Sequence, residues 1–140
     1  MKVGKERGVG FYHCISRVVD GQFVFQETQK EHFRELMREY ETFCEVRVLT
    51  YCLMSNHFHI LVEVPKRPDP EQLPSAERVL EKLGALSGHQ NVGAVRQRFE
   101  MFRQADDAAG EAKYLASFHA RMWDLSEFIK LLKQLVNLNA

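Results

Sequence analysis

Two β-like runs meet in the middle of the chain, E-V-R-V-L-T-Y-C-L-M-S (45–55) and N-H-F-H-I-L-V-E-V (56–64). Both are rich in β-branched, aromatic and aliphatic residues, which is typical of strands. Pro65 ends the second run, because proline lacks the backbone N–H that a central strand needs. The two runs therefore predict an antiparallel pair that turns near Ser55 and Asn56.

A further strand and a helix are predicted upstream. F-Y-H-C-I-S-R-V-V (11–19) has the composition of a strand and runs into an Asp-Gly turn signal at 20–21. Q-F-V-F (22–25) could return as a hairpin or continue as an irregular edge. Thr28 is expected to open a helix, with Glu31 completing a capping box. The apolar face of this helix consists of Phe33, Leu36, Met37, Tyr40 and Phe43.

The remainder reads as helical after a proline-rich connection, K-R-P-D-P-E-Q-L-P (66–74), which is predicted to be loop. D-D-A-A-G (106–110) interrupts the helical pattern, and Asp124 is expected to cap the last helix with Glu127 three residues on. The apolar stripes are Ala76, Val79, Leu80, Leu83 and Leu86; Val92, Val95, Phe99 and Phe102; Tyr114, Leu115, Phe118 and Met122; and Leu125, Phe128, Ile129, Leu132, Leu135 and Val136. With no internal repeat, this order predicts one domain over residues 1–140.

Composition narrows the class of protein. The 140 residues are 45% hydrophobic, so a substantial core is expected, and 19 basic side chains balance 19 acidic ones. Bulk charge therefore does not point to nucleic acid, and any basic surface must be local. The three cysteines, at 14, 44 and 52, form no C-x-x-C pair and are expected to be reduced and buried. Without a signal-peptide pattern or a run of membrane-spanning length, we expect a soluble cytoplasmic protein.

His57 and His59 are the most informative polar residues. Alternate side chains of a strand point to opposite faces, so the apolar Phe58 and Ile60 face the core and the two imidazoles share the other face, with Cα atoms roughly 6.5–7 Å apart. Two such rings can bind one divalent cation, and carboxylate, amide or water ligands can complete its coordination shell. Surface histidines without any ligand are the alternative. Glu63 shares the face but is expected to lie outside the ligand shell.

Three blocks of the chain resemble a known family. They are Y-H-C-I-S-R-V-V-D-G (12–21), V-L-T-Y-C-L-M-S-N-H-F-H-I-L-V (48–62) and W-D-L-S-E-F-I-K-L-L-K-Q (123–134). Together they resemble the REP-associated tyrosine transposases, bacterial members of the HUH endonucleases, in which two histidines flank a bulky apolar residue. The resemblance spans residues 10 to about 134, and the middle block is the most specific in order and spacing.

This resemblance implies a fold and a chemistry. The fold would be α+β, with a ferredoxin-like βαββαβ antiparallel sheet and helices on one face. His57 and His59 would hold a divalent metal, Mg²⁺ or Mn²⁺, against the scissile phosphate of single-stranded or hairpin DNA. A tyrosine on a C-terminal helix would attack the phosphorus and form a 5′-phosphotyrosine. The implied activity is DNA cleavage, rejoining and transposition in the bacterial cytoplasm.

The expected nucleophile is the main departure from the family. Leu135 and Val136 stand where the tyrosine is expected, and the arginine-rich segment and last strand that follow in the family are not found, so the chain reads as C-terminally shortened. Tyr114 is the helical tyrosine left as a candidate nucleophile, although its spacing from Phe118 favours a core role. We therefore expect weak or absent cleavage. A truncated, decayed or domesticated hairpin-binding form stays open, as does a metal-independent interaction protein.

A few other residues are assigned from their positions. Arg17, Lys133 and Asn56 are candidate DNA-binding residues. His13 is assigned a structural or supporting role near the histidine pair. Histidines 32, 89 and 119 are expected to be surface residues, and Trp123 a core anchor. An unpaired sheet edge, left by the absent last strand, would favour a homodimer.

Overall fold

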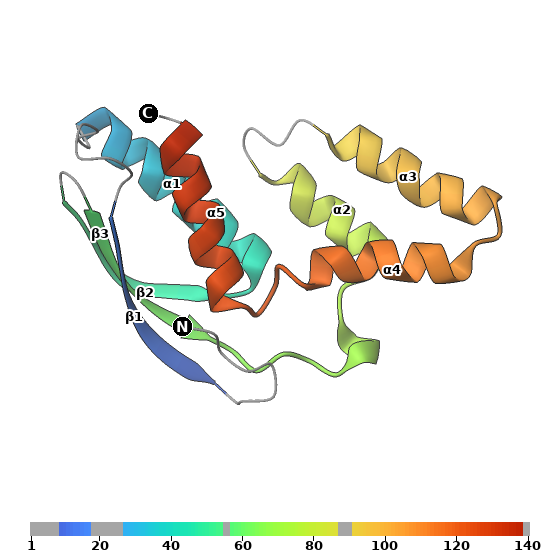
Figure 1. The fold of residues 1–140 in the computed structure, drawn as a ribbon, viewed down its shortest axis with the longest axis horizontal. Helices are drawn as coiled ribbons and strands as arrows, with labels where there is room; N and C mark the ends of the chain where they lie inside the picture. The colour runs from blue at the N-terminus through green and yellow to red at the C-terminus, as the bar shows by residue number, and fades with distance from the viewer. Residues whose placement is uncertain (1–8, 18–26, 55–56, 87–90, 139–140) are drawn as a thin grey trace.

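The computed structural model describes residues 9–17, 27–54, 57–86 and 91–138, with side chains described as far as residue 134. Figure 1 shows a sheet with helices on one of its faces, and a second group of helices beside them. The elements are β1 (Gly10–Arg17), α1 (Glu27–Cys44), β2 (Arg47–Leu53), β3 (His57–Val64), a 3₁₀ turn (Pro70–Gln72), α2 (Ala76–Gly84), α3 (Val92–Gln104), α4 (Ala108–His119) and α5 (Leu125–Leu138).

The sheet places the histidine strand in its centre. Its order is β1-β3-β2, and both pairings are antiparallel. Helices α1 and α5 pack against each other over one face of the sheet. Strand order and helix placement match a ferredoxin-like α+β fold in which the described residues supply three of the four strands. The predicted fold class is therefore confirmed.

Strict alternation along β3 builds the core. Phe58, Ile60, Val62 and Val64 are almost fully buried, and they pack with residues of α1 and α5. Burying each such side chain contributes about 1.5–3 kcal/mol of hydrophobic free energy. The predicted apolar face of α1 is also buried, apart from the half-buried Tyr40. The residues between these core positions on β3 are left on the open face of the sheet.

Two local predictions need correction. Helix α1 begins at Glu27, so Thr28 lies in its first turn rather than capping it. The proline-rich connection is not entirely irregular, because Pro70–Gln72 form a 3₁₀ turn. Proline suits the first turn of a helix, where its missing N–H would have no partner. The predicted turn at 20–21 and the run at 22–25 lie outside the described residues.

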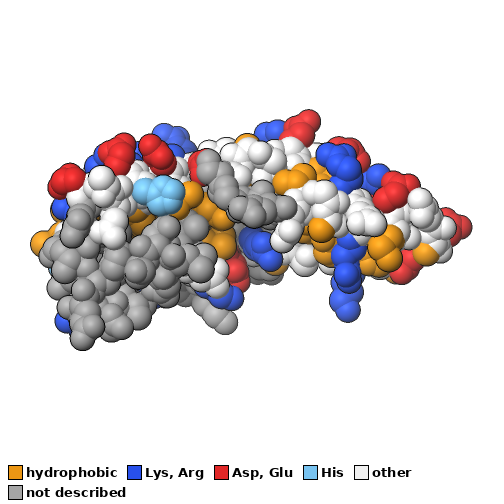
Figure 2. Space-filling view, turned by 90° about the horizontal axis from the view of Figure 1, so that it is seen from above, with side chains coloured by type: hydrophobic (Ala, Val, Ile, Leu, Met, Phe, Trp, Pro, Cys, Tyr) orange, Lys and Arg blue, Asp and Glu red, His pale blue; other side chains and the backbone are white. Residues whose placement is uncertain are grey.

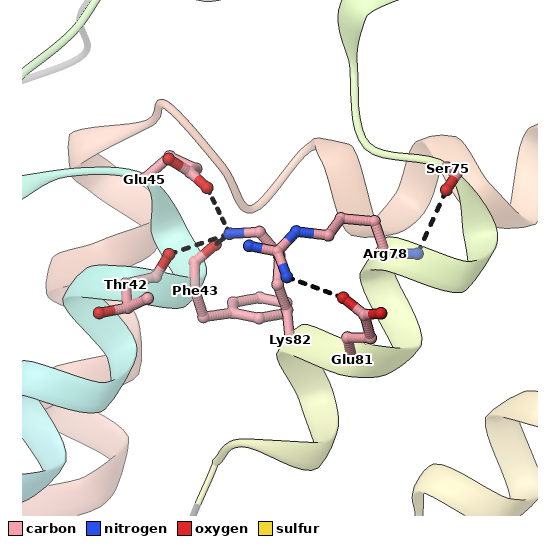
Figure 3. A network of polar contacts seen from close by, with 7 residues as sticks. All are labelled: Thr42, Phe43, Glu45, Ser75, Arg78, Glu81 and Lys82. Atoms are coloured by element: carbon pink, nitrogen blue, oxygen red, sulfur yellow. Dashed lines mark hydrogen bonds and ion pairs between the residues drawn. The ribbon is translucent and has the colours of Figure 1, made fainter.

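The remaining helices form a lobe, α2–α4, that is tied to α1 by Lys82. The Lys82 side chain is 4% exposed; its Nζ donates to the carbonyl of Thr42 at 3.0 Å and pairs with the carboxylate of Glu45. Figure 3 shows this contact joining α2 to the end of α1. A cation suits the C-terminal end of a helix, where backbone carbonyls lack partners and the helix dipole is negative.

The chain returns from the lobe to the sheet through a capped turn. The predicted cap is present, since the Glu127 N–H donates to Asp124 Oδ1 at 3.1 Å. Trp123 is half-buried against the core, as expected, and its backbone N–H donates to the Cys44 carbonyl at 2.8 Å. His119 was expected on the surface but is only 8% exposed, because its Nε2 lies 2.7 Å from the Pro74 carbonyl. In the described part of the chain, no helix has the length and apolarity needed to cross a membrane.

Candidate functional site

The candidate site lies on the open face of the sheet, where His57 and His59 meet. Both side chains are half-buried, and their ring centroids are 5.1 Å apart with planes inclined at 58°. Strand alternation brings the two rings together, because both residues project from the face of β3 that is turned away from the core. Two imidazoles so placed can offer nitrogen ligands to one cation.

A third imidazole stands beside the pair. His13 is exposed on β1, and its ring stacks on that of His59 with centroids 5.6 Å apart and planes 23° apart. The register explains the approach: Ile15 lies opposite His59, so His13 is its diagonal neighbour on the same face. The sequence predicts a structural or supporting role for His13, and the register places it on the same face as the pair.

Cys52 also reaches this face, contrary to the prediction that the cysteines are buried. It lies opposite His59 on β2 and is exposed. A bulge between Val48 and Thr50 explains the difference, because the extra residue reverses the faces of the positions after it. Tyr51 therefore turns toward the helices and Cys52 away from them.

The donor set fits a divalent cation in part. Within the described ranges, no group of three or more His, Cys, Asp or Glu side chains is placed to hold a metal ion. His57 and His59 can thus supply two nitrogen ligands, and water or phosphate oxygens would have to complete the shell. Neutral imidazole suits the later transition metals, whereas Mg²⁺ and Mn²⁺ prefer oxygen ligands, which water or phosphate would have to supply here.

The three candidate DNA-binding residues have separate outcomes. Arg17 is exposed at the end of β1 and lies opposite His57 in the register, so it belongs to the histidine face. Lys133 is exposed on α5 and lines a groove against β1 instead. Asn56 lies outside the described residues.

Tyr114 is not brought together with the histidines. It is half-buried on α4, with its ring centroid 4.9 Å from that of Phe99 and 5.2 Å from that of Phe118. The guanidinium of Arg98 lies 5.3 Å from the ring centroid. Figure 1 shows α4 in the helical lobe rather than over the open face of the sheet. The ring packs as a core residue of that lobe.

The other three tyrosines face the helices. Tyr12 and Tyr51 are half-buried and pack against the core from the helix side of the sheet, as does Tyr40 from α1. Burial raises the pKa of the Tyr40 hydroxyl above its usual value, which disfavours the phenolate. Positions 135 and 136 belong to α5, which packs on the side of the sheet opposite the histidines.

Apolar side chains surround the polar cluster. Phe11 and Ile15 are each 62% exposed on β1, on the same face as His13. Exposed aromatic and aliphatic groups beside polar ones are typical of surfaces that bind another molecule. In nucleic-acid proteins such groups contact unstacked bases.

Comparison with known protein families finds a match over this part of the chain. A family model described as "Transposase IS200 like" matches residues 10–76. Over this stretch the chain is similar to the IS200-like transposases. The match covers β1, α1, β2 and β3 and ends at the first residue of α2, so it includes His13, His57 and His59. No curated protein and no solved structure matched the chain.

The family match indicates a coarse class of function. Transposases act on DNA, and this family generally uses a divalent metal, so the match points to DNA as the class of partner. The lobe formed by α2, α3 and α4 lies almost entirely outside the matched residues. The part of this chain that carries the family pattern is therefore the part that builds the histidine face.

Proposed function

We propose that this IS200-like chain binds single-stranded or hairpin DNA on the open face of its sheet, with a divalent ion, Mg²⁺ or Mn²⁺, held by His57 and His59. The observation that carries the proposal is the 5.1 Å separation of the two ring centroids on one face of β3. The ion would polarise a bound phosphate and offset its negative charge.

Other residues of the face would position the strand. Arg17, opposite His57, can donate to a phosphate that lies over the histidines. The exposed Phe11 and Ile15 offer apolar surface to sugars and unstacked bases. His13 supports the ring of His59 by stacking on it, which limits the orientations of that ligand.

Binding without cleavage is favoured over the complete strand-transfer reaction. In that reaction a tyrosine hydroxyl would attack phosphorus, and the bond to the departing 3′ oxygen would break. Tyr114 packs among Phe99 and Phe118 in the helical lobe, and the other tyrosines face the helices. Among the described residues, the geometry therefore does not support any tyrosine as the nucleophile.

The first test measures binding of a fluorescent hairpin DNA with a single-stranded tail, by anisotropy, with and without Mn²⁺. We expect Mn²⁺ to raise the affinity about tenfold or more, equivalent to about 1.4 kcal/mol. The double variant His57→Ala/His59→Ala should lose this increment and keep the metal-free affinity. His32→Ala removes an exposed histidine of α1 and should behave as the wild type. Equal affinities of wild type with and without Mn²⁺ would refute the metal site.

The second test asks whether the chain cuts DNA. Labelled hairpin DNA is incubated with the protein and Mn²⁺ and then run on a denaturing gel. We expect no covalent protein–DNA adduct. An adduct that disappears in Tyr114→Phe would overturn binding without cleavage and establish Tyr114 as the nucleophile.

A further inference from the structure

A groove of about 580 Å³ runs between β1 and α5, and neither His57 nor His59 lines it. One wall is the outer strand β1, including Tyr12, His13 and Ile15. The other wall is α5, including Ser126, Lys130 and Lys133. Among the described residues that line it there is no aspartate or glutamate, so lysine sets the charge of the groove.

This local charge differs from the rest of the surface. Figure 2 shows basic and acidic side chains interspersed, in keeping with a net charge of zero. Several basic residues of the helices are paired with a carboxylate, as Arg78 is with Glu81. Lys130 and Lys133 are exposed, and within the described ranges neither has an ion-pair partner. Three residues apart on a helix, they project from the same side of α5.

The groove is continuous with the histidine face. His13 lines the groove and also a smaller hollow of about 120 Å³ that His59 and Cys52 line. Its ring stacks on His59, so a chain of phosphates could pass from the histidine pair over the β1 edge into the groove. Ile15 and Ile129 add apolar surface there, which suits unstacked bases rather than a paired duplex.

We propose that the groove between β1 and α5 binds the single-stranded DNA segment adjoining the nucleotide at the histidine pair, with Lys130 and Lys133 each neutralising one phosphate. This inference rests on the proposed function, since it extends the path of the same DNA strand. Binding to the groove depends on charge and is independent of the metal.

The salt dependence of DNA binding tests the proposal. Each neutralised phosphate of a single strand contributes about 0.7 to the slope of log K against log salt, so Lys130→Ala/Lys133→Ala should lower the slope by about 1.4. The affinity should fall roughly 10- to 30-fold at 0.1 M salt. Lys66→Ala/Lys113→Ala is the matched control: it removes two exposed lysines outside the groove, and its slope should equal that of the wild type.

A second measurement locates the contact on the DNA. Uncharged methylphosphonate linkages are placed one by one along the single-stranded tail. In wild type, two neighbouring substitutions should weaken binding, and in Lys130→Ala/Lys133→Ala the same substitutions should have no further effect. If those substitutions weaken the variant as much as the wild type, or if the salt slope is unchanged, the groove does not bind the strand.

Failure of the groove and failure of the metal site remain distinguishable. If Mn²⁺ raises the DNA affinity of the wild type but the lysine variant keeps the wild-type salt slope, only the proposal for the groove is refuted. A lowered slope in the lysine variant, with no Mn²⁺ increment in wild type, supports the groove and refutes the metal site. Unchanged thermal unfolding of the lysine variant shows that its loss of binding is not loss of fold.

Discussion

At the scale of single residues, position in the fold gives two identical side chains, Cys44 and Cys52, different properties. Cys44, the last residue of α1, is completely buried, and burial raises the pKa of its thiol to about 12. Cys52 is exposed opposite His59, although the sequence suggests no difference between the two. Whether a thiol meets solvent therefore depends on whether its residue points into the core, as Cys44 does, or onto the open face of the sheet, as Cys52 does.

This contrast predicts the order of thiol modification. At pH 7.5 maleimide should label Cys52 fast and Cys14, which is half-buried, more slowly, while Cys44 should react only after unfolding. The thiolate is the nucleophile, and the raised pKa of Cys44 leaves almost none of it at this pH. Peptide mapping by mass spectrometry measures the three rates. Hairpin DNA with Mn²⁺ should slow labelling of Cys52, because bound DNA would cover its neighbour His59.

Cys52→Ser controls for the assignment of the labelled peptide and should abolish the fast phase. Fast labelling of Cys44 in the folded protein would contradict the burial described above. Equal labelling of Cys52 with and without saturating DNA would place the DNA away from the histidine face.

At the scale of elements, the connection between α2 and α1 depends on a buried cation. Lys82 Nζ satisfies carbonyl groups at the end of α1 and pairs with Glu45 in the turn that leads to β2. Glu45 has a positive φ of 56°, which is uncommon for a residue with a side chain. The pair thus helps to hold the turn that aligns β2 against the histidine strand.

Replacing Lys82 by methionine tests this connection. Lys82→Met keeps the length of the side chain but removes the donor, so buried carbonyls lose a partner. We expect a loss of about 1–3 kcal/mol in the free energy of unfolding, measured with urea. Arg78→Ala, which breaks the exposed pair with Glu81 shown in Figure 3, should change it by less than about 1 kcal/mol. Equal effects of the two variants would contradict a structural role for Lys82.

At the scale of the whole molecule, the helical lobe and the sheet share one core. Phe99 of α3 and Phe118 of α4 belong to the same buried cluster as Phe58 of the histidine strand and Phe128 of α5. The lobe is therefore not an independent attachment, although the family match ends where it begins. Unfolding of the described fold should be one cooperative event.

Phe99→Ala should destabilise the whole molecule. The side chain is 1% exposed, and truncating such a phenylalanine costs about 3–5 kcal/mol. Far-UV circular dichroism and the fluorescence of Trp123, the single tryptophan, should shift together to lower urea concentration. Met101→Ala, at an exposed position of the same helix, should leave both curves within about 0.5 kcal/mol of wild type. Two separate transitions in Phe99→Ala would show that the lobe unfolds on its own.

Local pattern predicted much of this fold. Alternation in residues 57–64 assigned the core and open faces of β3 correctly, and helical spacing identified the buried faces of α1, α2 and α5 as far as side chains are described. The burial expected for the cysteines from their number and spacing was wrong for Cys52, because one bulge reverses the faces of the residues that follow it. Local pattern also failed for His119, because the Pro74 carbonyl that pairs with its ring nitrogen is distant along the chain.

By itself the sequence determined which residues alternate on the central strand, and so which two imidazoles lie on the same face, because that depends only on the period of a β-strand. Only the tertiary structure decided what surrounds them. The stacking of His13 on His59, the exposure of Cys52 and the groove beside Lys130 and Lys133 arise from the register between strands and from the separation of α5 from β1. Those relations join residues far apart along the chain, and packing of the shared core fixes them.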